Sequence, residues 1–456
     1  MAATTSTTSR LLTTKYADAV TSGKIIASKK VIAACKRHKR DLKRQGTKNF
    51  PWVFDEEVAL RPVKFIEKFC KPSQGDFDIL KLMPWQHFVI GSLYGWVHKK
   101  NRVRRFKYGL IFVARKNGKS GMVSALSLYG ASKDSEKGAR VYQLANSMKQ
   151  ARVVFDECKA MIDVSPKLKK HFRSLLHAIH YDVTKSKIEP QASDSEKLDG
   201  LNCHLGIFDE IHEYKNYKLI NVIKKSTGTR RQPLIIYITT AGYQLEGPLM
   251  DYYEKGADVL EGVIREERSF YFMAELDEDD DIENSELWIK ANPSLGVLLD
   301  LNTMKEEWET EKHIPAERND FITKRLNIFV QSDEQSFVPL EVINRNRDHI
   351  EPETLAGQIC IGGYDLSSSE DFTAACLEFP LEDGRVFVLS HSWVPQAKVD
   401  ADRENMSANF KEWVKSGWLT IGPGEFVQKE DVYDWFLAMS RRYGIAKIAY
   451  DPANAY

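Results

Sequence analysis

The sequence predicts an α/β protein made of two unlike parts. Between residues 105 and about 274, short apolar segments alternate with segments of helical period. This alternation is typical of a mainly parallel sheet that is covered by helices on both faces. After a polar stretch at residues 331–339, three strand-like segments follow one another with only short turns between them, which predicts an antiparallel meander. We therefore expect a parallel-sheet domain, a linker and a smaller α/β domain.

The size and composition of the chain fit this division. Its 456 residues suffice for two to three domains at roughly 150 residues each. Hydrophobic residues make up 43% and charged residues 28%, as in globular proteins, and the net charge of +1 gives no argument for a nucleic-acid partner. No apolar run of about 18 residues predicts a membrane span, and the N-terminus lacks a secretion signal. Six scattered cysteines without a C-x-x-C pair indicate reduced thiols of a cytosolic protein.

Charge is unevenly distributed along the chain. The first fifty residues are strongly basic, most of all at residues 36–40, and a second basic cluster occupies residues 98–105. An acidic run at residues 275–283 balances them. Residues 1–50 are predicted to form a basic, helical arm. The uneven distribution is a weak argument for a nucleic-acid partner, but we expect each charged run to be a solvated surface.

The expected elements follow in order. Residues 55–100 should be helical, with Pro84-Trp85-Gln86 between helices, and residues 285–330 should be helical again. In the first part we expect strands at 110–114, 140–145, 187–192, 205–208 and 234–239, and helices at 147–162 and 217–225. In the second part we expect strands at 359–365, 373–378, 386–392, near Leu419 and at 445–450, and helices at 403–416 and 429–443.

The loop RKNGKS, residues 115–120, follows the apolar segment 110–114 and precedes a helical pattern. A strand, a tight loop ending in Gly-Lys-Ser and a helix form the context of a phosphate-binding loop, whose backbone N–H groups cradle a triphosphate. Lys119 would reach the β- and γ-phosphates of ATP, and the Ser120 hydroxyl would bind Mg²⁺. Val113 stands where the usual pattern has its first glycine. Arg115 would either contact the γ-phosphate or hold the loop by pairing with an acid.

A second motif is the apolar segment 205–208, which ends in Asp209 and Glu210. Asp209 would hold Mg²⁺ through water, while Glu210 would polarise the water that attacks the γ-phosphate. The alternative is a strand that ends in two solvated acids.

Two weaker signals accompany these motifs. The segment 234–239 ends in Thr239 and Thr240, whose hydroxyls would sense the γ-phosphate, although a plain strand-to-turn junction would look the same. Gln86 lies upstream of the loop, and its amide is able both to donate to and to accept from the edge of adenine.

Taken in order, these motifs resemble the large terminase subunit of tailed double-stranded DNA phages. The resemblance covers roughly residues 60–456 and rests on residues 84–86, 114–120, 198–202, 207–213, 230–233 and 238–242. In that family an arginine stands in the phosphate loop, as Arg115 does here, and the first glycine is often missing. The resemblance implies that Arg115, Lys116, Asn117, Gly118, Lys119 and Ser120 bind ATP, and that Arg115, Lys119 and Glu210 are catalytic.

The resemblance also implies the domain order. We expect a basic arm at 1–50, a P-loop ATPase motor domain at 51–330, a linker at 331–340 and an RNase H-like α/β nuclease domain at 341–456. Asp365 and Asp451 match the first and second acids of a two-metal nuclease, and Asp371 matches a frequent additional acid. These acids would bind Mg²⁺ or Mn²⁺. The family's last acid normally lies well beyond its second, so we expect the nuclease domain to be incomplete through C-terminal truncation.

The implied function is an ATP-driven motor that packages viral double-stranded DNA into a procapsid and cuts concatemers. Its partners would be double-stranded DNA, the small terminase subunit and the portal protein. Several copies of the chain would form a ring when docked, whereas the protein in solution would be a monomer. It would work in the host cytoplasm and would not bind a membrane. The alternatives are a helicase-like, DNA-dependent ATPase whose C-terminal domain only binds nucleic acid, and a scaffold with a relic nucleotide site. The candidates for the residue that would act in trans are Lys197, Arg230 and Arg231, and the sequence does not choose among them.

Overall fold

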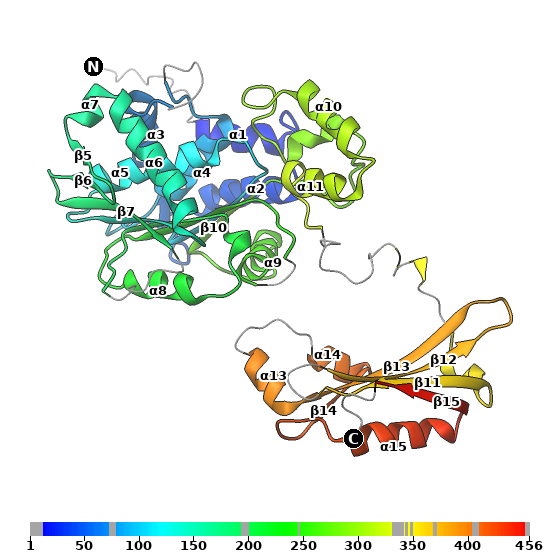
Figure 1. Cartoon of the computed structure of the whole chain (residues 1–456). Helices are drawn as coiled ribbons and strands as arrows, with labels where there is room; N and C mark the ends of the chain where they lie inside the picture. Colours follow the sequence, from blue (N-terminus) through cyan, green and yellow to red (C-terminus); the bar gives the residue numbers. More distant parts are fainter. Residues whose placement is uncertain are drawn as a thin grey trace, which may run out of the picture. The chain divides into compact units, whose positions relative to one another are not determined.

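The computed structural model divides into two units, Met1–Ser336 and Phe337–Tyr456. It describes residues 12–72, 79–192, 200–244, 247–330, 342, 345–346, 350–367, 372–403 and 410–451. Figure 1 shows both units with their elements labelled.

The first unit is built around an eight-stranded sheet with the strand order β10-β3-β9-β8-β4-β7-β6-β5. Its strands are β3 (Tyr108–Phe112), β4 (Arg140–Ala145), β5 (Phe172–Ser174), β6 (Ile179–Tyr181), β7 (Ser186–Ala192), β8 (Leu205–Asp209), β9 (Leu234–Thr239) and β10 (Ser269–Met273). The ladder is parallel from β10 to β7, and only β6 and β5 pair antiparallel at the far edge. The prediction of a mainly parallel sheet is confirmed.

Helices cover both faces of this sheet, with α3 to α6 on one side and α8 and α9 on the other (Figure 1). The helices are α1 (Leu12–Thr21), α2 (Lys29–Arg44), α3 (Glu56–Phe69), α4 (Pro84–Gly95), α5 (Lys119–Ser132), α6 (Met148–Val164), α7 (Pro166–Lys169), α8 (Lys218–Ser226), α9 (Pro248–Glu261), α10 (Leu301–Glu311) and α11 (Pro315–Arg325). A two-stranded ladder joins β1 (Trp52–Phe54) to β2 (Trp96–His98), and 3₁₀ turns occupy Ile211–Glu213 and Ser285–Lys290.

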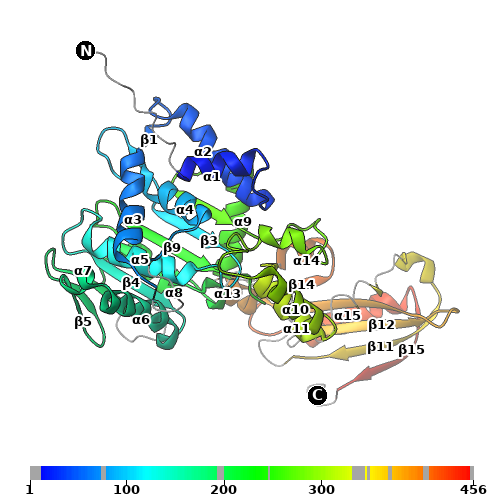
Figure 2. The ribbon, with the colours of Figure 1, turned by 90° about the horizontal axis from the view of Figure 1, so that it is seen from above.

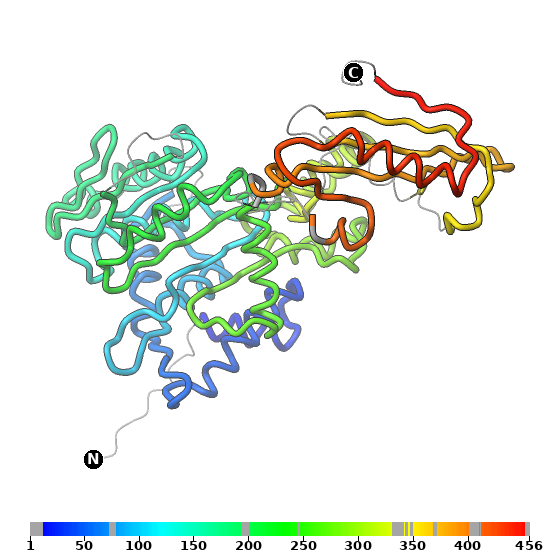
Figure 3. Tube along the Cα trace, turned by 90° about the horizontal axis from the view of Figure 1, so that it is seen from below, coloured from blue at the N-terminus to red at the C-terminus, as the bar shows by residue number. Residues whose placement is uncertain are grey.

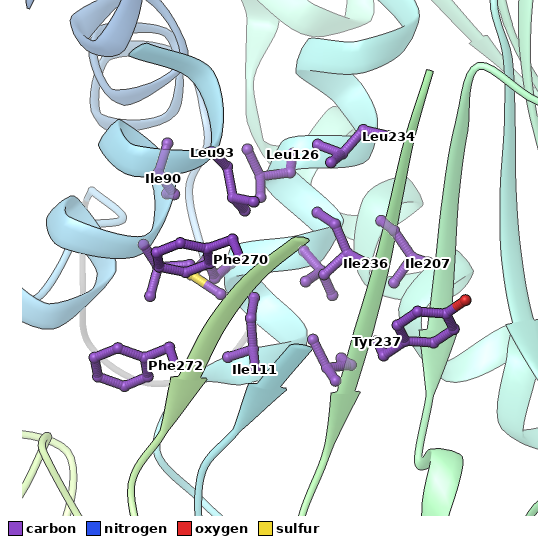
Figure 4. Packing of buried hydrophobic residues seen from close by; sticks show 14 of the residues in the cluster. Ile90, Leu93, Ile111, Leu126, Ile207, Leu234, Ile236, Tyr237, Phe270 and Phe272 are labelled. Atoms are coloured by element: carbon purple, nitrogen blue, oxygen red, sulfur yellow. The ribbon is translucent and has the colours of Figure 1, made fainter. Parts of the chain in front are cut away.

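The central strands are apolar along their whole length because both of their faces are buried. Every residue of β8, β9 and β10 is buried. Figure 4 shows Ile111, Ile207 and Ile236 of neighbouring strands packing beside Leu126 of α5 and Leu93 of α4. Full burial of such a side chain contributes about 1.5–3 kcal/mol, so this core holds the carboxyl ends of the strands in fixed positions.

Several element predictions for the first unit are wrong, among them the helical assignment of Trp96–His98, which is strand β2. Pro84 does not lie between helices but begins α4, since proline fits the first turn of a helix, where its missing N–H is not needed. The segment Ser269–Met273 was not among the predicted strands, yet it forms the sheet edge beside β3.

The predicted solvated surface holds for Lys36, Arg40 and Lys43 of α2, which are exposed, but not for every residue of the two basic runs. Helix α1 packs against α4, and α2 packs against β10 and α9 (Figure 2). Arg37 is 7% exposed and donates to Ser269 O at 2.9 Å. Arg105 is fully buried, 2.8 Å from Asp41 Oδ2, and also pairs with Glu267. Paired acids and carbonyls make such burial tolerable, so the predicted solvated surface is wrong at these positions.

The acidic run behaves in the same way. Glu275 and Asp277 are buried. Lys30 pairs with Glu275, and Lys290 lies 2.9 Å from Asp277. The expectation of a solvated acidic surface is therefore wrong at these two positions, because facing lysines compensate the buried charge.

The second unit contains a five-stranded sheet with the order β14-β13-β12-β11-β15 (Figure 3). Its strands are β11 (Ile359–Asp365), β12 (Thr373–Pro380), β13 (Val386–Pro395), β14 (Leu419–Gly422) and β15 (Gly444–Tyr450). β11, β12 and β13 form the predicted antiparallel meander, and β15 joins β11 in parallel. Helix α15 (Lys429–Ser440) packs closely on β11. The space is so narrow that a Cβ at Gly362 would lie 2.8 Å from the Phe436 ring.

The predicted helix 403–416 is wrong in its bounds. The structure has α13 (Gln396–Arg403) and α14 (Phe410–Lys415), and residues 404–409 lie outside the described part of the chain. Among the helices that the structure describes, none is both long enough and apolar enough to cross a membrane.

Candidate active sites

Three polar segments of the first unit meet at the carboxyl edge of the sheet. β9 lies between β3 and β8, and its register pairs Thr239 with Phe112 and Ile238 with Asp209. The loop after β3, the threonines that end β9 and the acids that end β8 are therefore neighbours. Ligands of open α/β sheets bind outside the carboxyl ends of the strands, so the edge is suited to a nucleotide.

The loop after β3 has the tight backbone of an anion cradle. Lys116 and Gly118 adopt positive φ angles of 62° and 83°, and α5 begins directly afterwards at Lys119. Lys119 Nζ donates to Ala114 O at 3.0 Å and to Val113 O. Burial lowers the pKa of Lys119 to about 8, although the nearby carboxylates of Glu210 and Asp209 act to raise it. The ammonium group of Lys119 is thus bound to carbonyls of the loop and lies near the carboxylates of Glu210 and Asp209.

Asn117 braces the loop from within. Its Nδ2 donates to Ala114 O at 3.1 Å and to Asn292 Oδ1 at 2.9 Å, and its Oδ1 accepts from Ser294 N at 3.0 Å. Trp85 Nε1 in turn donates to Ser294 Oγ at 2.8 Å. The side chain of Asn117 thus holds the loop in place, and its backbone carbonyl accepts from Ser294 Oγ at 3.1 Å. Sequence reasoning missed Asn292 and Ser294, because they lie far along the chain and belong to no motif.

Gln86 also contacts the loop. Its Oε1 accepts from Met83 N at 2.9 Å, which caps α4, and its Nε2 donates to Gly118 O at 3.2 Å. The side chain is 4% exposed. The predicted contact of Gln86 with adenine stays a prediction, and in this structure the amide joins α4 to the loop.

The two acids after β8 have opposite shifts in pKa. Burial raises the pKa of Asp209 to about 7, assisted by the charge of Glu210 and opposed by Lys119. Burial acts to raise the pKa of Glu210 as well, but contact with His212 and the charge of Lys119 outweigh it and hold that pKa at about 2. Two neighbouring carboxyls whose pKa values are driven apart are suited to different roles. A bound cation would favour the ionised form of Asp209.

The remaining loop residues lie on the same edge. Arg115 N donates to Lys324 O at 3.0 Å. Its half-buried guanidinium forms no hydrogen bond or ion pair with any residue that the structure describes, and its charge lowers the pKa of Lys119 and of Glu210. Lys116 is exposed and Ser120 is half-buried at the start of α5. Thr240 Oγ1 donates to Ala241 O at 3.0 Å.

The candidates for a residue acting in trans are not equivalent. Arg230 lies 3.1 Å from Glu136 and donates to Gly138 O at 2.9 Å, so it clamps two loops. Arg231 donates to Asn101 O at 2.8 Å. Lys197 is outside the described residues.

In the second unit, Asp365 ends β11 and Asp451 follows β15. The register pairs Tyr364 with Tyr450, and their rings stack at 5.4 Å, so the two acids occupy the next pair of positions. Neighbouring strands lie about 4.8 Å apart, a spacing at which two carboxylates are able to share an ion. Asp371 is outside the described residues, within which no group of three or more His, Cys, Asp or Glu side chains is placed to hold a metal.

Comparisons with known proteins match both units. The family described as terminase large subunit, ATPase domain, matches residues 84–257, and terminase large subunit, endonuclease domain, matches residues 263–456. The endonuclease match thus begins before the division between the two units at residue 336.

Individual relatives are similar at low identity. Protein YmfN of Escherichia coli K12 is 28% identical over 265 residues, which are 56% of this chain and 58% of YmfN. The terminase large subunit of Lactococcus phage p2 is 23% identical over 424 residues, 88% of this chain and 75% of that protein. The crystal structure of the HK97 bacteriophage large terminase shares the fold with a TM-score of 0.52 and 22% identity, over 88% of this chain and 80% of that one.

The two family matches are consecutive and together cover most of the chain. An ATPase domain uses a nucleotide, and the nuclease domain that follows it uses a divalent metal ion. The chain therefore belongs to the terminase large subunit family, whose members join an ATPase domain to an endonuclease domain in order to package and cut phage DNA.

Proposed function

We propose that this chain is an ATP-driven motor that moves viral double-stranded DNA into a procapsid and cuts concatemeric DNA with its second unit. The observation that carries the proposal is the meeting of the loop at 115–120, Thr239 and the acids Asp209 and Glu210 at one sheet edge. A helicase-like protein would share this edge, but it would not need Asp365 and Asp451 side by side on neighbouring strands.

The residues at the edge divide the work of ATP hydrolysis. The loop amides and Lys119 bind the β- and γ-phosphates, Ser120 and Asp209 hold Mg²⁺, and Glu210 polarises the attacking water. Mg²⁺, when bound, neutralises charge on the phosphates. In order to bind the phosphates, the Lys119 ammonium group leaves the carbonyls of Val113 and Ala114. The larger set of nucleotide contacts comprises Gln86, Arg115, Lys116, Asn117, Gly118, Thr239 and Thr240, with Arg115 on the γ-phosphate.

In the second unit Asp365, Asp371 and Asp451 hold Mg²⁺ or Mn²⁺, since such hard cations prefer carboxylate oxygens. The ions would stabilise the attacking and leaving oxygens of the cleaved phosphodiester. The proposed partners are double-stranded DNA, the small terminase subunit and the portal protein, with several copies forming a ring at the portal in the host cytoplasm.

Binding to DNA should be independent of sequence and steeply dependent on salt. A motor must grip a phosphate backbone whose bases change constantly, and each neutralised phosphate adds about −0.9 to the slope of log K against log salt. We expect affinity for a duplex to fall by about 10³-fold between 50 and 200 mM salt. Fluorescence anisotropy with two duplexes of equal length and unrelated sequence measures this, each duplex serving as the control for the other. A flat salt response, or tight binding to one duplex alone, would contradict the motor.

A further inference from the structure

His212 lies between the two strand ends that the proposed function places around the γ-phosphate. Its Nδ1 is 3.2 Å from Glu210 Oε2, at the end of β8, and 3.0 Å from Thr239 Oγ1, at the end of β9. Its backbone N–H also donates to Thr239 Oγ1 at 3.3 Å. One side chain therefore touches both the acid after β8 and the hydroxyl that ends β9.

Packing fixes the imidazole ring in this place. A Cβ at Gly242 would lie 2.9 Å from His212 Cβ and 3.0 Å from its ring carbon Cδ2, so the ring occupies the space that a side chain would need there. The preceding residue of that turn, Ala241, is held as well, because its N–H donates to Asn327 Oδ1 at 2.7 Å. The ring is thus seated against a braced turn.

The hydrogen bonds also define which nitrogen carries the proton. Thr239 Oγ1 donates to Thr240 O at 2.9 Å, so it must accept from His212. Nδ1 therefore carries a hydrogen that is directed at Thr239, and the same nitrogen lies 3.2 Å from Glu210 Oε2. Oε2 of Glu210 is buried and makes no hydrogen bond within the described residues, so the ring of His212 is the polar group that borders it.

Glu210 needs such support because its backbone is unusual. Its φ angle is 48°, a left-handed conformation that non-glycine residues adopt rarely and that is frequent at functional sites. The chain leaves the ladder at this residue, so no neighbouring strand orients the side chain.

We propose that His212 is a positioning residue that orients the Glu210 carboxylate toward the attacking water and ties that orientation to the end of β9. This inference rests on the proposed function, in which Glu210 polarises water. A shift of Thr239 would move the imidazole ring that borders the Glu210 carboxylate, so β9 and the acid act together. His212 touches neither ATP nor the reacting atoms in this scheme.

The test compares three substitutions of His212 by steady-state ATP hydrolysis. Asparagine places an amide N–H close to the position of Nδ1, whereas glutamine reaches toward the position of Nε2 and alanine offers no donor. We expect His212→Ala and His212→Gln to lower kcat about 10- to 100-fold with KM for ATP changed less than about twofold, since misplacing a catalytic group costs up to about 10²-fold. His212→Asn should recover most of kcat. His87→Asn is a matched control, because His87 lies in α4 and its Nε2 is 3.3 Å from Glu67 of α3 instead of Glu210.

A double-mutant cycle with Thr239→Val completes the test. If the two residues act as one unit, His212→Ala in the Thr239→Val background should lower kcat by less than about twofold further. Wild-type kcat for His212→Ala, equal loss for the asparagine and alanine variants, or a rise in KM alone would overturn the inference. Glu210→Gln is measured alongside: if it hydrolyses ATP normally, the proposed catalytic role of Glu210 fails and the inference falls with it. If only His212→Ala is normal, the inference fails alone.

Discussion

Glu210→Gln should reduce ATP hydrolysis by about 10²- to 10⁴-fold while ATP binding stays close to that of the wild type. The amide has the size of the carboxylate but is a poor base, and the carboxylate is ionised over the whole working range because its pKa is held at about 2. Phosphate release measures turnover, and binding of a fluorescent nucleotide measures affinity. Turnover at the wild-type rate would show that another group polarises the water.

Lys119→Ala extends the same prediction to the phosphate loop. Removing the ammonium group takes away charge that should stabilise the transferring phosphoryl group, so we expect a loss of about 10²-fold or more in turnover. Lys133→Ala is the matched control, because Lys133 is the exposed residue that follows the other end of α5. The control should keep wild-type turnover, and a similar loss in both variants would indicate damage to the helix instead.

In a form of the protein whose nuclease domain cleaves DNA, Asp365→Ala and Asp451→Ala should each abolish metal-dependent cleavage while ATP hydrolysis survives. Each carboxylate is expected to supply oxygens to the same pair of ions, so losing either one dismantles the site, and the ATPase residues lie in the other unit. Plasmid nicking in Mg²⁺ and in Mn²⁺ measures cleavage, with phosphate release on the same preparations.

Asp383→Ala is the control for the nuclease variants, since Asp383 is an exposed acid of the β12–β13 turn that pairs with Arg385. Its cleavage should match that of the wild type. Cleavage that persists in Asp365→Ala would contradict the assignment. So would an experimental structure in which the carboxyl groups of Asp365 and Asp451 lie more than about 10 Å apart, given the ion spacing that a two-metal site needs.

The central sheet was predictable because the amino-acid composition of its strands indicates that they are buried. Strands buried on both faces are apolar throughout, and β4 and β9 have the predicted bounds. β11 also has the predicted bounds. The short turns between it and the next two strands indicated the meander. Asp365 and Asp451 were singled out only by the resemblance to the terminase family, and the register shows that their strands are adjacent.

What escaped prediction depends on contacts between distant segments. Arg105 looks like surface charge in the sequence, but Asp41 and Glu267 pair with it across the fold. Arg37 does too, but the carbonyl of Ser269 accepts a hydrogen bond from it. Asn292 braces the phosphate loop from far along the chain, and no local pattern marks it. His212 belonged to the recognised motif, but its contact with Thr239 exists only because β8 and β9 are neighbours.

The most direct test of the account is an experimental structure of the protein with a non-hydrolysable ATP analogue and Mg²⁺. We expect the β- and γ-phosphates to lie over the loop at 115–119 and Lys119 Nζ to be released from the carbonyls of Val113 and Ala114. The metal ion should be in contact with Ser120 and close to Asp209. A nucleotide bound elsewhere, or one bound at the loop while Lys119 stays on those carbonyls, would contradict the account.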